Sequence, residues 1–151
     1  MTSYRERLSP PPLVYLALLM VVPASVLVFL PINIPVGWLV GIVLFFGFGI
    51  ALWFGSPVLR IDDEGFHAGR AVLYPAEIGT AAAFLAEDAT AERGVRLDAR
   101  AWTLFRGWVH PVLKIELTDL TDPAPYWLVS TRHPQKLSRA IDSIRPRIPG
   151  R

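Results

Sequence analysis

The sequence predicts an α+β membrane protein, in which a two-helix transmembrane hairpin is followed by a small antiparallel β-sheet or barrel domain that ends in an amphipathic helix. Three observations lead to this fold class. From Leu8 to Leu59 there is no Asp, Glu, Lys or Arg, although charged residues make up 19% of the chain. Short runs of alternating apolar and polar residues follow, and then a helical apolar period. The absence of cysteine excludes disulfide scaffolds, thiolate metal sites and a cysteine nucleophile.

The uncharged block divides into two apolar runs, residues 13–30 and 36–54, with Pro31-Ile32-Asn33-Ile34-Pro35 between them. At about 1.5 Å of rise per residue, each run approaches the roughly 30 Å thickness of a bilayer's hydrocarbon core. Pro23 lies in the middle of the first run and is expected to kink that helix. The block therefore predicts a transmembrane hairpin over residues 13–54.

The charges beside the hairpin predict its orientation. Arg5 and Arg7 precede the first run, Arg60 follows the second, and the connection between the runs has no charge. Because positive charge is retained on the cytoplasmic side, both termini are expected inside a plasma (inner) membrane. Residues 1–12 are then a cytoplasmic N-terminal tail.

Two other interpretations of the block are disfavoured. A cleaved signal peptide would end near Pro23-Ala24-Ser25, but the apolar sequence continues through that site. A buried helical hairpin of a soluble protein would be expected to show a polar face, and the block has none.

Small residues in the second run form two ladders. Gly37 and Gly41 make one GxxxG step, and Gly47, Ala51 and Gly55 make a second series on a different face of the helix. One face is expected to let the first helix approach closely, and the other is a candidate contact for a second subunit, including a second copy of the chain.

Residues 58–151 predict one small cytoplasmic domain. Alternating apolar and polar positions indicate strands at 58–61, 66–68, 70–74, 80–85, 95–105, 113–118 and 126–131. A helix over about 134–145 follows, because Leu137, Ile141, Ile144 and Ile148 recur at helical spacing.

Three segments carry a resemblance to a known family: residues 59–66, residues 70–74 with Glu77-Ile78, and residues 126–132. With the hairpin, they resemble an actinobacterial membrane-protein family catalogued as domain of unknown function 3093. The strand order and the terminal helix are also similar to bacterial pleckstrin-homology-like (PH-like) domains. Neither resemblance implies a catalytic residue or a cofactor.

No motif predicts a metal site or a cofactor. Asp62-Asp63-Glu64 lacks the alternating oxygen spacing of a calcium loop and is interpreted as a solvated hairpin turn. His67, His110 and His133 are scattered, without the short spacing that metal-binding histidines show.

The sequence also favours a protein that is not an enzyme. Ser130 lacks the GxSxG context of a nucleophile, and no glycine-rich phosphate loop precedes a helix. A membrane enzyme acting on lipid or envelope precursors is the alternative, and its candidate residues are Arg60, Asp62, His67 and Arg132.

Charge is unevenly distributed along the domain: residues 60–92 are mainly acidic and residues 93–151 mainly basic. Basic side chains near an anionic leaflet contribute about 1 kcal/mol each. The basic residues proposed as a face toward lipid headgroups or an acidic partner are Arg93, Arg96, Arg100, Arg106 and Arg132. Trp108, in a predicted loop, is the candidate aromatic contact with the membrane interface or a partner.

These observations predict a membrane-anchored, non-enzymatic protein whose β-domain binds a protein partner or anionic lipid headgroups. An accessory subunit of a transporter or of a cell-envelope or division complex is the alternative. Nucleic-acid binding is not expected, because the domain is nearly neutral overall and has no recognition motif.

Overall fold

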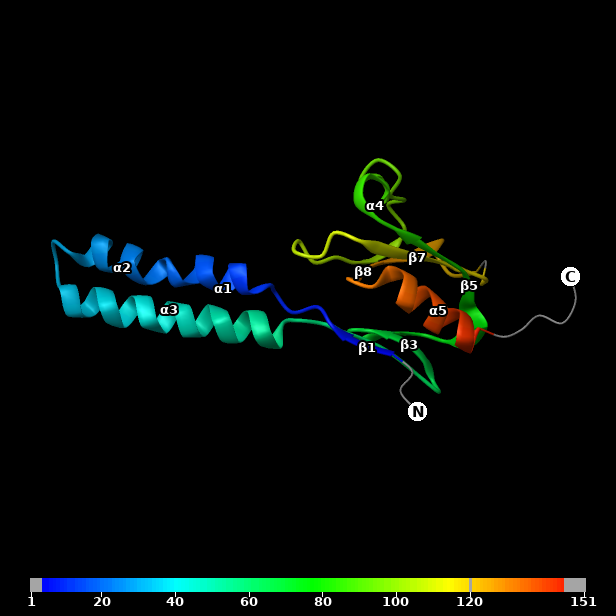
Figure 1. The fold of residues 1–151 in the computed structure, drawn as a ribbon, viewed down its shortest axis with the longest axis horizontal. Helices are drawn as coiled ribbons and strands as arrows, with labels where there is room; N and C mark the ends of the chain where they lie inside the picture. The colour runs from blue at the N-terminus through cyan, green and yellow to red at the C-terminus, as the bar shows by residue number, and fades with distance from the viewer. Residues whose placement is uncertain (1–3, 120, 146–151) are drawn as a thin grey trace, which may run out of the picture. The chain divides into compact units, whose positions relative to one another are not determined.

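The computed structural model describes residues 4–119 and 121–145 and divides the chain into two compact units (Figure 1). One unit, the hairpin unit, is Ser9–Ser56. The other, the β-domain, contains the residues on both sides of it, up to Leu8 and from Pro57 onward. The β-domain is therefore discontinuous in sequence, with the hairpin unit inserted between its first two strands.

The hairpin unit consists of α1 (Pro12–Leu19), α2 (Val21–Phe29) and α3 (Ile34–Phe54). The break between α1 and α2 lies one turn before Pro23, because proline has no N–H to donate to the preceding turn. Asn33 is the N-cap of α3, and its side chain accepts a hydrogen bond from the Val36 N–H at 3.4 Å.

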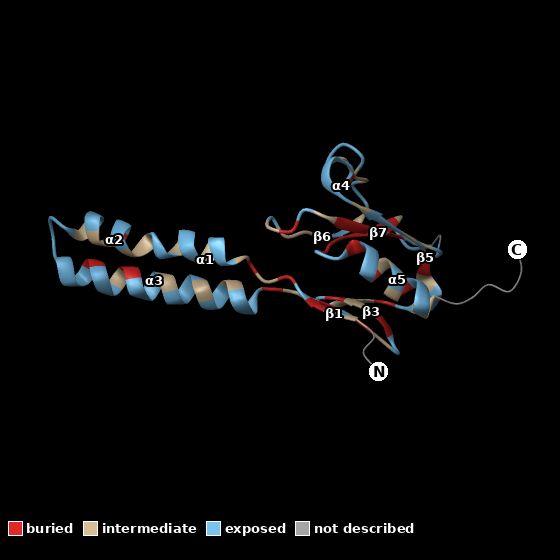
Figure 2. Ribbon diagram, viewed as in Figure 1, coloured by how far each residue is buried: buried red, intermediate tan, exposed pale blue. Residues whose placement is uncertain are grey.

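Taken together as one helix, α1 and α2 (Pro12–Phe29) are long and apolar enough to cross a membrane, and so is α3 (Ile34–Phe54). In their most apolar windows only 6% and 11% of the residues are buried, and most of the hairpin unit is coloured as exposed or intermediate (Figure 2). This exposure does not fit the interpretation as a buried hairpin of a soluble protein, because core helices bury their apolar side chains.

Sheet A is antiparallel and has the strand order β1-β2-β3-β4. Its strands are β1 (Tyr4–Arg7), β2 (Val58–Asp62), β3 (Gly65–Ala68) and β4 (Ala71–Leu73). Strand β1 lies within residues 1–12, which the sequence predicted to be a tail. The structure corrects this prediction, because residues 4–7 form an edge strand paired with β2.

Sheet B has the order β5-β7-β8-β6 and is mixed. Its strands are β5 (Ile78–Phe84), β6 (Trp102–Leu104), β7 (Val112–Leu117) and β8 (Tyr126–Ser130), and the 3-10 turn η1 (Pro75–Glu77) precedes it. Strand β6 pairs with β8 in parallel. The prediction of one antiparallel sheet is therefore wrong, since the domain has two sheets and one parallel pair.

A helix, α4 (Ala86–Arg93), was missed by the sequence analysis. The expected strand over 95–105 is reduced to β6, and the alternating Val95, Leu97 and Ala99 lie in the loop before it. Val95 is 93% exposed, so this alternation does not mark a buried face.

The core lies between the two sheets and includes α5 (Pro134–Ile144). Leu137 and Ile141 of α5 are fully buried there, whereas Ile148 lies outside the described residues. The α5 helix covers the side of sheet B that faces sheet A, and α4 covers the opposite side (Figure 1). Strand β8 is buried along its whole length because both faces of sheet B are covered.

Candidate functional site

The β-domain has one end at which the chain leaves for the hairpin unit and returns from it. Leu8 and Pro57 are adjacent there, since the Leu8 N–H donates to the Pro57 carbonyl at 3.0 Å. We call this the attachment end. The Gly69 N–H donates to the Val58 carbonyl at 3.0 Å, which places the β3–β4 turn at the same end.

Sheet B contributes two further segments to the attachment end. The Trp108 indole N–H donates to the Leu8 carbonyl at 3.1 Å, and the Arg132 guanidinium donates to the Arg7 carbonyl at 3.1 Å. The loop 105–111 and residues 131–133 therefore lie beside the point where the chain leaves β1.

The segments at the attachment end are basic. Those beside the two connections to the hairpin unit are residues 7–8, 57–58, 69–71, 105–111 and 131–133, and they contain no Asp or Glu. Two acidic residues of α4, Glu87 and Asp88, also lie toward this end, because α4 follows β5 where Phe84 pairs with Val112. We call the basic residues of the listed segments, together with Trp108, the basic rim: Arg7, Arg70, Arg106, Trp108, His110, Arg132 and His133. All are at least partly exposed, so their charges act on the surroundings of this end.

The opposite end of the β-domain is acidic. The β2–β3 turn lies there, and so do η1 and the β7–β8 connection, because the Thr118 N–H donates to the Glu77 carbonyl at 2.9 Å. The acidic residues of these segments are Asp62, Asp63, Glu64, Glu77, Glu116, Asp119 and Asp122. Two described basic residues also lie toward this end: Arg145, which follows α5, and Arg100, which precedes β6 and forms an ion pair with Asp98. Charge is thus separated along the strand direction.

Three of the arginines proposed as a basic face, Arg93, Arg96 and Arg100, are paired within the domain. Arg93 donates to the Val109 carbonyl at 2.9 Å and lies 4.9 Å from the centre of the Phe105 ring. Arg100 forms an ion pair with Asp98 at 3.1 Å. Arg96 belongs to a larger network on α4.

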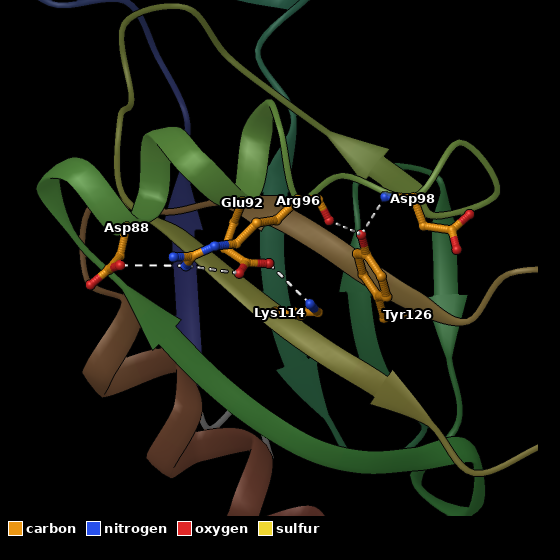
Figure 3. A network of polar contacts seen from close by, with 6 residues as sticks. All are labelled: Asp88, Glu92, Arg96, Asp98, Lys114 and Tyr126. Atoms are coloured by element: carbon orange, nitrogen blue, oxygen red, sulfur yellow. Dashed lines mark hydrogen bonds and ion pairs between the residues drawn. The ribbon is translucent and has the colours of Figure 1, made fainter.

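The α4 network is centred on Glu92, which is buried (Figure 3). Its carboxylate lies 2.9 Å from the Lys114 ammonium and 3.5 Å from the Arg96 guanidinium. The Tyr126 hydroxyl accepts from the Asp98 N–H at 2.7 Å, and the Lys114 ammonium lies 4.2 Å from the centre of the Tyr126 ring (Figure 3). These contacts hold α4 and the following loop on sheet B, so they serve packing and not recognition of a ligand.

The other proposed residues, Arg106, Trp108 and Arg132, all belong to the basic rim. Each also makes a contact that positions it: Arg106 donates to the Phe105 carbonyl at 2.9 Å, and Trp108 and Arg132 contact the end of β1. The sequence analysis missed Arg7 and Arg70, because their neighbours at this end are distant in sequence.

A buried carboxylate fastens β1 to the rest of the domain. Glu6 accepts hydrogen bonds from the Thr131 hydroxyl at 2.5 Å and from the Arg132 N–H at 2.8 Å. The Tyr4 hydroxyl donates to the same carboxylate at 2.6 Å. Desolvation, together with this hydrogen bond to an anion, raises the pKa of Tyr4 far above its usual range. Glu6 thereby holds Arg132 of the basic rim against β1.

Three residues of the enzymatic alternative, Arg60, Asp62 and His67, contact one another. The Asp62 carboxylate lies 3.0 Å from the Arg60 guanidinium and 2.9 Å from His67 Nε2. Desolvation acts to raise the pKa of Asp62, but the hydrogen bonds from His67 and the Glu64 N–H, with the Arg60 charge, hold it below its usual value. Arg132, the fourth candidate, contacts β1 instead.

Asp62, Glu64 and His67 also have potential metal-ligand atoms within 4.8 Å of one another. Both oxygens of Asp62 already have partners, one of which is the Arg60 guanidinium. A second cation at this position would be repelled by Arg60. The geometry therefore favours an ion-paired turn over a metal centre.

The two glycine ladders of α3 have different surroundings. A Cβ added at Gly37 or Gly41 would lie 2.9 or 2.8 Å from a backbone atom of α2, so these glycines allow the two helices to touch. A Cβ at Gly47 would meet nothing within 4 Å, and Ala51 is exposed. Gly55 follows α3 as its C-cap, where a Cβ would meet only the carbonyl of Ala51.

Gly41→Ala is expected to destabilise the hairpin unit, because the new methyl group must push the α2 backbone away. Overpacking of this kind costs about 1–3 kcal/mol. Gly47→Ala is the matched control, since it makes the same change of helix propensity in open space. Thermal unfolding of the detergent-solubilised protein should show a lower midpoint for Gly41→Ala only, and equal midpoints would contradict the packing described here.

The chain belongs to the family described as "Protein of unknown function (DUF3093)", which matches residues 3–141. No match was found among curated proteins or among solved structures. The family match covers β1, the hairpin unit, both sheets and most of α5, so the basic rim lies entirely within it.

Proposed function

We propose that this protein is a non-enzymatic membrane anchor whose cytoplasmic β-domain binds anionic lipid headgroups through its basic rim. The observation that carries the proposal is the separation of charge in the β-domain. Basic residues collect at the attachment end and acidic residues at the opposite end. The end tethered to the apolar helices is thus the end that an anionic leaflet attracts.

The connection between the two units supports a hairpin topology. Because β1 pairs with β2, both ends of the hairpin unit return to one sheet. If the helices cross a membrane, both termini then lie on the same side, and the arginines beside the hairpin favour the cytoplasmic side of a plasma membrane. Cleavage near Ser25 would remove β1, so a signal peptide does not fit this domain.

The tethers are short enough for headgroup contact. Only Ser9–Pro11 separate Leu8 from α1, and only Gly55 and Ser56 separate α3 from Pro57. At no more than about 3.5 Å per residue, such a tether spans roughly 14 Å. The Debye length at physiological salt is about 8 Å. Because the tether length is an upper limit, it allows the rim charges to approach an anionic surface to within that distance. The proposal also includes a PH-like fold for the β-domain. It rests on the order of the strands and the terminal helix along the sequence.

Hydrogen exchange of the full-length protein in nanodiscs tests the proposal. Segments 105–111 and 131–133 should exchange more slowly when anionic phosphatidylglycerol is added to phosphatidylcholine, and high salt should reduce the difference. Arg70→Gln should weaken this protection, because each basic residue near the surface contributes about 1 kcal/mol. Arg139→Gln removes the same charge from the exposed side of α5 and is the control. Equal exchange in neutral and anionic nanodiscs would contradict the proposal.

A further inference from the structure

The register of sheet A aligns three basic side chains on its outer face. Arg5 of β1 lies opposite Arg60 of β2, and Arg60 lies opposite His67 of β3. Alternate residues of a strand point to opposite faces. Because Leu59 and Ile61 beside Arg60 are fully buried in the core, the three basic residues point away from it.

These side chains line a cavity. Arg5, Arg60 and His67, with Val58 and Gly69, enclose a volume of about 370 Å³. Small-molecule sites begin at roughly 300 Å³, so the cavity has room for a single headgroup-sized ligand. Val58 and Gly69 belong to the attachment end, and the cavity therefore opens beside the basic rim.

The two arginines form an arrangement that is unfavourable without a counter-ion. Like charges directly opposite on neighbouring strands destabilise a sheet. Arg60 is compensated on one side, where its Nε lies 3.0 Å from the Asp62 carboxylate. Arg5 is exposed and has no ion-pair partner among residues 4–119 and 121–145. The uncompensated charge is therefore that of Arg5, which lines the cavity.

Asp62 orients Arg60 and His67 but does not itself line the cavity. Its second oxygen lies 2.9 Å from His67 Nε2, so one carboxylate fixes both the His67 ring and the Arg60 side chain. Arg60 contacts Asp62 through Nε. Its Nη groups can bind an oxyanion, which a guanidinium can hold through two parallel hydrogen bonds.

We infer that this cavity binds a phosphate group, with Arg5 and Arg60 as its charged ligands and Asp62 as the positioning residue. The inference deepens the proposed function and rests on it only for the source of the phosphate, which is an anionic lipid headgroup or a soluble phosphate ester. The basic rim attracts a charged surface without selectivity, whereas the cavity selects one group of defined geometry.

Inorganic phosphate is the first probe, used with the full-length protein in neutral detergent. Added at constant ionic strength, it should raise the midpoint of thermal unfolding in a saturable manner. Arg5→Gln and Arg60→Gln should weaken the apparent affinity on the order of tenfold or more, since each removes a charge-assisted hydrogen bond. Arg139→Gln should behave like the unmodified protein. A shift no larger than that given by chloride, or an equal shift in Arg5→Gln, would overturn the inference.

Nanodiscs distinguish the two sources of the phosphate group. If phosphatidic acid abolishes the effect of inorganic phosphate and phosphatidylglycerol at equal charge does not, the ligand is a lipid phosphomonoester. If neither lipid competes, the cavity binds a soluble phosphate ester. Because the detergent measurement involves no lipid, its failure rejects the cavity alone, whereas equal hydrogen exchange in neutral and anionic nanodiscs rejects the role of the basic rim.

Discussion

A chain in which residues 4–8 are joined by a short glycine-serine linker to Pro57 is expected to fold as an isolated β-domain, whereas residues 57–145 alone are expected to remain unfolded. Residues 4–8 supply the fully buried Leu8 and, in β1, the Glu6 carboxylate. Losing the burial of one leucine costs about 1.5–3 kcal/mol. Two donors left without an acceptor cost about 1–3 kcal/mol each. The sum is comparable with the whole stability of a small domain, about 5–15 kcal/mol.

Nuclear magnetic resonance and circular dichroism of the two chains provide the measurement. The linked chain should give dispersed amide signals and a cooperative melt, because the Leu8 nitrogen and the Pro57 oxygen are only 3.0 Å apart and a short linker closes the gap. A linked chain with residues 4–8 in scrambled order controls for length and composition. A dispersed spectrum from residues 57–145 alone would contradict the role assigned to β1.

Glu6→Ala is expected to lower the free energy of unfolding of the β-domain by about 2–6 kcal/mol. The substitution leaves the buried Thr131 hydroxyl and the Arg132 N–H without their acceptor, and each unsatisfied donor costs about 1–3 kcal/mol. Urea unfolding of the linked chain measures the change directly. Glu6→Gln should have a smaller effect, because the amide keeps one acceptor oxygen.

Arg5→Ala is the matched control for Glu6→Ala. It lies next to Glu6 on the same strand, on the exposed face, and makes no contact with the core. Its effect without phosphate should be within about 0.5 kcal/mol, as for other surface substitutions. If the two alanine variants were equally stable, Glu6 would not be the residue that fastens β1.

The sequence predicts most elements whose buried side chains are apolar and alternate. Leu113 and Ile115 mark β7, and Leu137 and Ile141 mark α5, because each pattern matches the period of its element. Strand β1 was missed since its buried residue is Glu6, a carboxylate that pattern analysis assigns to the surface. Its burial depends on Thr131, which lies 125 residues further along the chain.

Helix α4 was missed although its signal is present. Ala86–Arg93 consists mainly of residues with high helix propensity, has Glu87 and Asp88 in the first turn and Arg93 in the last, and is followed by Gly94. The apparent alternation of 95–99 competed with this signal. A strand assigned there also made Arg93 and Arg96 look like one face, whereas Arg93 contacts the loop 105–111 and Arg96 pairs with Glu92 of α4.

The basic rim was predicted only in part for a topological reason. When the charges are grouped by their position along the sequence, the domain has an acidic first part and a basic second part. The rim groups charges by the end of the strand at which they occur. Arg7, Arg70, Arg106 and Arg132 come from four separate segments, and only the pairing of β1 with β2 and of β7 with β8 places those segments together.

The bond between Glu6 and Thr131 also constrains when the β-domain can form during synthesis. Strand β1 leaves the ribosome first. Its partner β2 emerges only after both apolar helices, and Thr131 emerges only after nearly the whole chain has been made. Contacts of such large sequence separation form late and slowly. Until then β1 is an unpaired strand, and unpaired strand edges are prone to aggregation.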